Sequence, residues 1–130
     1  MKKNPEYGVL RAEYLQGCSV EVALNIIGGK WKGMILYTLL DGTKRFNELR
    51  QIIPGITQRM LTLQLRELED CGIVQRVVYP EVPPRVEYSL TEFGRTLEPV
   101  ILAMRNWGDT YKSKLDEIKA QYNESDNSIR

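Results

Sequence analysis

The chain has 130 residues, 42% of them hydrophobic and 27% charged, which is typical of one globular domain with a hydrophobic core. The net charge of +1 argues against a wholly basic nucleic-acid protein, and no apolar run is long enough to cross a membrane. The N-terminus lacks the apolar segment of a signal peptide, and the two cysteines lie far apart. We therefore expect a cytoplasmic protein without a structural disulfide.

The charge is unevenly distributed along the chain. Seven basic residues between Gly28 and Arg66 stand against two acidic ones, so this segment has a charge of +5 and the remainder −4. An anionic partner would therefore bind near this segment. Residues 1–17 hold only a weak apolar pattern, and we interpret them as an N-terminal arm of open function.

The first two expected helices follow this arm. Ser19 is a suitable N-cap for a helix over residues 20–27, with Leu24 and Ile27 facing inward and Gly28-Gly29 ending it. A second helix is predicted over residues 30–40, because apolar residues recur there every four positions. Asp41-Gly42 stops this helix, and residues 43–45 are a linker or a single short strand.

A helix-turn-helix is predicted next. Residues 46–53 suit a short helix, and Pro54-Gly55 turns the chain into a longer one. Thr57 is the expected N-cap of this longer helix, and Gly72 occupies the position just beyond its end, where a left-handed residue is needed. Its apolar stripe is formed by Leu61, Leu65 and Leu68.

The opposite face of this helix is polar and partly cationic. Its side chains are the types that read base edges and hold phosphates when a helix lies in a DNA major groove, namely Gln58, Arg59, Thr62, Gln64 and Arg66. The alternative is an ordinary amphipathic surface helix that binds nothing.

A β-hairpin is predicted after this helix. Residues 73–79 and 86–90 have strand patterns, and the proline-rich segment 80–85 between them makes a stiff tip. A hairpin in this place is the wing of a winged helix, and Arg85 at its tip would enter a minor groove or meet a phosphate. The alternative is a plain hairpin on which Arg85 is only solvated.

The chain ends in a long helix, which Thr91 is expected to cap. Its apolar stripe is too long for so small a domain to cover, so we expect the part from Met104 onward to pair with a second copy. Pro99 predicts a bend near residues 95–99, and the polar tail from Asn123 is expected to fray. The expected dimer contacts are Met104, Trp107, Tyr111, Leu115 and Ile118.

The expected fold class is mainly α with a small β-hairpin, a winged helix-turn-helix with a long C-terminal dimerisation helix. Several segments in order resemble the HxlR family, a branch of the MarR-like winged-helix transcription regulators of bacteria. They are CSVE from Cys18, IGGKW from Ile27, RFNEL from Arg45, PGI from Pro54, LRELE from Leu65, YPEVPPRVEY from Tyr79, and Leu90-Thr91. The resembling domain would span residues 18–111, with the helix end and tail at 112–130.

The resemblance implies a homodimeric DNA-binding regulator on a near-palindromic operator, and we expect a repressor. In that reading Gln58, Arg59 and Thr62 face base edges, whereas Lys44, Arg45 and Arg66 hold phosphates. The full set of expected DNA-binding residues is Lys44, Arg45, Thr57, Gln58, Arg59, Thr62, Arg66 and Arg85. A small-molecule effector could bind near Trp31, Trp107 or Tyr111.

The resemblance also suggests a thiol sensor, because some members of the family use a cysteine just before the first helix. Cys18 occupies that place, and a helix N-terminus favours the reactive thiolate. The alternative is an inert cysteine kept for packing, which is also our interpretation of Cys71.

An enzyme is not expected, because the chain has no histidine, no phosphate-binding glycine loop and no paired nucleophile and base. A metal or other cofactor is likewise not expected. The competing function is a winged-helix module that binds proteins without DNA, since fold alone does not define function.

Overall fold

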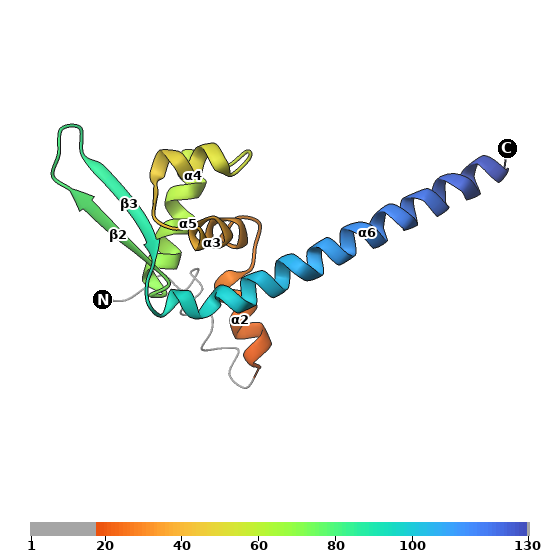
Figure 1. Cartoon of the computed structure of the whole chain (residues 1–130), viewed down its shortest axis with the longest axis horizontal. Coiled ribbons are helices and arrows are strands. Elements are labelled where there is room, and N and C mark those ends of the chain that lie inside the picture. Colours follow the sequence, from red (N-terminus) through yellow and green to blue (C-terminus); the bar gives the residue numbers. More distant parts are fainter. Residues whose placement is uncertain (1–17, 130) are drawn as a thin grey trace. The chain divides into compact units, whose positions relative to one another are not determined.

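The computed structural model of the protein describes residues 18–129, so the expected N-terminal arm lies outside the described residues. These residues divide into two compact units between Glu98 and Pro99. The first unit holds the helices α2 to α5 and a small sheet, and the second is formed by the long helix α6 (Figure 1).

The first two helices are α2, Ser19–Ile27, and α3, Lys32–Leu40. Ser19 was expected at the N-cap of α2, but Cys18 occupies it with extended backbone angles. Leu24 was expected to face inward and instead has 56% of its surface exposed, because α2 buries only Ile27 in its last turn. The start of α3 shifts from residue 30 to residue 32, since Gly29 at φ +89° turns the chain first.

The helix-turn-helix consists of α4, Phe46–Ile52, and α5, Gln58–Asp70. Both predicted ends of α5 are confirmed. The hydroxyl of Thr57 accepts a hydrogen bond from the Met60 N–H at 3.1 Å. At the other end Gly72 has φ +75°, and the N–H groups of Gly72 and Ile73 donate to the carbonyls of Glu69 and Leu68, both at 3.0 Å. These two bonds form a Schellman motif.

The core of the first unit lies between α3, α4 and α5. Its largest fully buried side chains come from those helices and from the first residue of β2, and they are Ile35, Leu36, Leu39, Leu49, Leu61, Leu65, Leu68 and Val74. The predicted stripe of α5 is therefore the face that packs inward. This packing leaves the polar side of α5 facing outward.

The sheet has three antiparallel strands in the order β1-β3-β2, with β1 at Lys44–Arg45, β2 at Val74–Tyr79 and β3 at Arg85–Leu90. The wing consists of β2, β3 and the turn over residues 80–84 (Figure 1). Arg85 was expected in that turn, but it is the first residue of β3 and pairs with Tyr79. The register also places Lys44, Tyr88 and Arg76 side by side across the sheet.

The C-terminal helix does not begin at Thr91 as expected. The Thr91 hydroxyl accepts from the Gly94 N–H at 2.9 Å and donates to the Gly72 carbonyl at 2.6 Å, and a 3₁₀ helix, η2, follows over Gly94–Leu97. Helix α6 then spans Glu98–Ile129. Pro99 lies in its first turn, where no N–H donor is required. The tail expected to fray is helical through Ile129, since neither proline nor glycine interrupts it.

Candidate nucleic-acid interface

The outer face of α5 presents a row of polar side chains. Gln58, Thr62 and Arg66 are spaced four residues apart, so they lie along one line of the helix. Gln58 and Arg66 are exposed, Thr62 is half-buried, and Arg59 is exposed next to this row. The Thr62 hydroxyl donates to the Gln58 carbonyl at 2.8 Å, so its proton is used within the helix.

A groove of about 820 Å³ separates this row from the wing. We call it the wing groove. Its walls come from α4, the first half of α5, and the strands and turn of the wing. Its polar lining includes Arg45, Asn47, Gln51, Gln58, Thr62, Arg76 and Arg85, together with the acids Glu48 and Glu81. Such a groove offers many hydrogen-bond donors to a polyanion.

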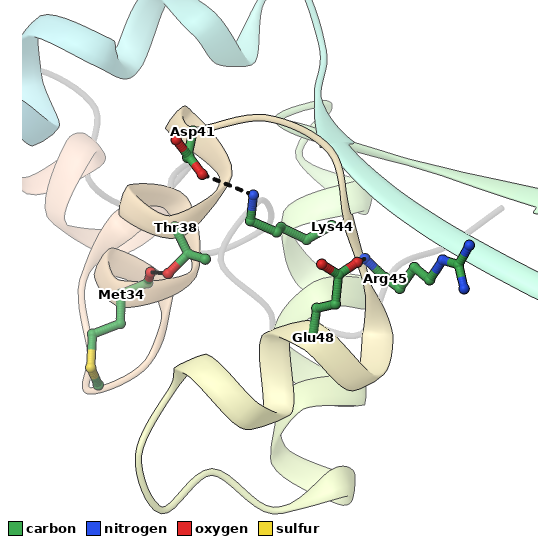
Figure 2. Close-up of polar contacts among 6 residues, drawn as sticks. All are labelled: Met34, Thr38, Asp41, Lys44, Arg45 and Glu48. Carbon is green, nitrogen blue, oxygen red and sulfur yellow. Dashed lines mark hydrogen bonds and ion pairs between the residues drawn. The ribbon is translucent and has the colours of Figure 1, made fainter.

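Arg45 at the start of α4 has a free guanidinium. The backbone N–H of Arg45 donates to Glu48 Oε1 at 2.9 Å, whereas the side chain of Arg45 points away from Asp41 and Glu48 (Figure 2). Among the described residues the Arg45 guanidinium has no ion-pair partner, and the same holds for Arg59 and Arg66. These three arginines are therefore available to an anion.

Three lysines of the basic segment are engaged within the protein. Lys44 Nζ lies 3.1 Å from Asp41 Oδ2, and its side chain is only 15% exposed (Figure 2). Lys32 is buried and forms an ion pair with Glu67 on α5. Lys30 lies over the Trp31 ring at 4.7 Å. Lys32 and Lys44 are neutralised by carboxylates, so the positive surface is formed by the arginines and by the exposed Lys30 rather than by the whole +5 segment.

Arg85 is also engaged. Its guanidinium lies 3.1 Å from Glu81 Oε1, 3.8 Å from Glu87 Oε1 and 4.0 Å from the centre of the Tyr79 ring. These contacts hold the side chain along the base of the wing turn. Arg85 would have to exchange Glu81 for a phosphate in order to contact DNA.

Arg76 is a cation of this surface that the sequence reasoning missed. It lies on β2 opposite Tyr88 and lines the wing groove. Its guanidinium has no ion-pair partner among residues 18–129. The hairpin register could have identified Arg76 from sequence, because pairing Val74 with Leu90 places Arg76 on the same face as the buried Tyr88.

The cysteines occupy different environments. Cys18 is an exposed free thiol immediately before α2, and Cys71 is half-buried at the C-terminal end of α5. Within the part of the chain that is described, no group of three or more His, Cys, Asp or Glu side chains is arranged to hold a metal ion.

Helix α6 exposes an apolar stripe. Val100, Met104, Trp107, Tyr111, Ile118 and Tyr122 are all exposed, and the rings of Trp107 and Tyr111 stack at 5.4 Å. An apolar hollow of about 670 Å³ lies over the first turns, lined by Pro99, Val100, Ala103, Met104 and Trp107. Among residues 18–129, no helix has both the length and the apolar content that a bilayer span requires.

A helix-turn-helix followed by a wing, with a polar outer face on the second helix, defines the winged-helix class of DNA-binding regulators. Residues 26–116 match the sequence profile of the HxlR-like helix-turn-helix family. The chain belongs to this family, as the resemblance predicted.

The relatives of the chain are transcription regulators rather than enzymes. The chain is 60% identical over 91% of its length to YdeP of Bacillus subtilis, an uncharacterised HTH-type transcriptional regulator, and covers 93% of that protein. It is 68% identical to the redox regulator HypR in its oxidised form, with a TM-score of 0.69 over 72% of this chain and 96% of the other. It is 44% identical to the reduced form of the regulator YodB from B. subtilis, with a TM-score of 0.64 over 72% of this chain and 93% of the other.

Proposed function

We propose that the chain is a dimeric repressor that reads a near-palindromic operator with α5 and responds to thiol oxidation through Cys18. The observation that supports operator reading most directly is that Gln58 and Thr62 line the wing groove, with Arg59 exposed beside them on α5. Gln and Arg side chains form paired hydrogen bonds with adenine and guanine edges, and the Thr62 methyl group can contact a thymine methyl group.

The apolar stripe of α6 supports dimerisation. Exposed apolar side chains at helical spacing are the pattern by which a helix pairs with another, and the stripe includes Met104, Trp107, Tyr111, Leu115 and Ile118. Two copies related by a two-fold axis would place their α5 helices about 34–36 Å apart, in successive major grooves. An inverted repeat is the DNA sequence that such a pair would recognise.

The position of Cys18 supports the proposed response to oxidants. Its thiol is exposed immediately before α2, where an oxidant can reach it. The relative HypR is described as a redox regulator, and YodB has been studied after treatment with diamide. Cys71 is half-buried and serves as the matched control thiol. A response to a small-molecule effector stays a prediction.

The experiment is selection of binding sites from a random duplex pool, once with reductant and once with diamide. An inverted repeat recovered only under reductant, with Cys18→Ser but not Cys71→Ser recovering it under both conditions, is the expected result. An inverted repeat under both conditions with the unmodified protein would remove the thiol response and keep the regulator. No enrichment in either pool would favour the protein-binding module.

Repression is tested separately, by in vitro transcription from a promoter that overlaps the selected repeat. Repression requires that the added protein lowers transcript yield, and a rise in yield would identify an activator.

A further inference from the structure

A second hollow of about 250 Å³ lies between α5 and the wing, next to the wing groove. We call it the basic hollow. It is lined by Thr62, Arg66 and Glu69 of α5, Arg76 of β2 and Tyr88 of β3. Three of these residues, Thr62, Arg76 and Tyr88, also line the wing groove, so the two cavities are adjacent and share a wall.

The fold brings Arg66 and Arg76 to this hollow from opposite sides. Arg66 follows Thr62 by one turn of α5, so both side chains face the wing. Arg76 pairs with Tyr88 across the β2-β3 ladder, and directly paired residues point to the same face of a sheet. Because Tyr88 is buried on the face toward the helices, Arg76 projects toward α5.

Neither guanidinium is neutralised. Among the described residues, Arg66 and Arg76 have no ion-pair partner and their side chains make no hydrogen bond, although Glu69 lines the same hollow. Arg85 and Lys44 on the same surface are each held by a carboxylate. Two arginines against one glutamate leave a net charge of +1 in the hollow. Each guanidinium presents a planar fork of N–H donors that matches the geometry of a phosphate.

We propose that Arg66 and Arg76 together hold one backbone phosphate of the DNA strand that passes between α5 and the wing. The wall that the hollow shares with the wing groove favours a DNA phosphate over a free anion, because a strand in that groove would pass beside the hollow. This inference rests on the proposed DNA-binding function. It adds Arg76, a residue of strand β2, to the DNA contacts of α5. The shared phosphate contact would set the position of α5 on the duplex.

The test compares the unmodified chain with Arg66→Gln, Arg76→Gln and the double variant on the selected inverted-repeat duplex, over a series of salt concentrations. Arg76→Gln is expected to weaken binding about tenfold, since it removes a hydrogen bond between charged groups. Each phosphate contact contributes about 0.9 to the slope of log K against log salt. If the two arginines share one phosphate, the salt slope of the double variant should be shallower by about 0.9 per copy of the chain.

A loss of about 1.8 per copy in the double variant would mean two separate phosphates and would overturn the shared site. Unchanged affinity and slope in Arg76→Gln would also overturn it. If the unmodified chain binds no duplex at all, the proposed function fails and this inference with it. Binding by the unmodified chain with an unaffected double variant makes only this inference fail.

Four controls separate this contact from other effects. Arg76→Lys keeps the charge and should keep the salt slope, whereas Glu69→Gln removes the only acid of the hollow and should tighten binding. Arg95→Gln alters an exposed arginine on η2 that lines neither cavity and should change nothing. A scrambled duplex should show the same fold loss for Arg76→Gln, because phosphate contacts do not depend on base sequence.

Discussion

Lys32 on α3 and Glu67 on α5 form an ion pair whose side chains are only 11% and 13% exposed. The pair joins α5 to α3, between residues that are 35 positions apart in the sequence. Removing one partner would leave the other charge buried without compensation, which is more costly than removing both. The pair therefore links the orientation of α5 to the stability of the first unit.

We expect Lys32→Met to lower the free energy of unfolding by about 3 kcal/mol, and Glu67→Leu to do so to a similar extent. The double variant Lys32→Met with Glu67→Leu should recover most of the loss, because two apolar groups of similar size can pack in place of the ions. Urea denaturation of the four proteins measures these values. Additive losses in the double variant would contradict an energetic coupling between the two residues.

Arg59 is exposed beside the polar row of α5 and has no ion-pair partner among the described residues. Arg59→Ala should weaken binding to the selected duplex by about 1–3 kcal/mol and should relax its preference for one base, since a bidentate contact to guanine would be lost. Titration of the selected duplex and of single-base variants measures both effects. An equal loss on every duplex would assign Arg59 to a phosphate instead.

Glu81 holds Arg85 at 3.1 Å and so competes with DNA for this guanidinium. Glu81→Gln should tighten duplex binding and steepen the salt slope by up to about 0.9 per copy, because Arg85 then keeps only its longer contact with Glu87, at 3.8 Å, and can exchange it for a phosphate. Glu92→Gln removes one exposed acid outside the wing and controls for net charge. Weaker binding by Glu81→Gln would indicate that its contact with Arg85 instead preorganises the wing.

Trp107 is 67% exposed in the middle of the α6 stripe. Trp107→Glu should weaken self-association by about 2 kcal/mol or more, since truncation of a buried interface aromatic typically has this cost. Sedimentation equilibrium measures the change. Ser113→Glu makes the same change of net charge at an exposed position of α6 outside the stripe and should leave association intact. An unchanged molar mass in Trp107→Glu would place the dimer contacts elsewhere.

The basic segment, residues 28–66, shows what a count of charges can predict and what it cannot. Counting charges located the positive region of the chain, but it treated Lys32, Lys44 and Arg66 alike. In the structure Lys32 and Lys44 are held by carboxylates, whereas Arg66 has no ion-pair partner among the described residues. A net charge says nothing about pairing, because the partner of Lys32 lies in a different helix.

The ends of α5, its apolar stripe and the family of the chain could all be predicted from sequence. Thr57 caps the first turn and Gly72 ends the last, and both effects act within a few residues of the chain. Such local signals need no knowledge of the fold.

Which side chains meet at the proposed interface could not be predicted from sequence, because it depends on how distant segments pack. Arg76 reaches α5 because the β2-β3 register puts it beside Tyr88, and Arg85 lies against Glu81 because it begins β3 rather than ending the turn. No sequence pattern distinguishes Gly94 from the other glycines, but in the structure a Cβ at this position would lie 2.1 Å from the Ile73 carbonyl oxygen. These relationships depend on packing between segments far apart in the chain, which no local pattern encodes.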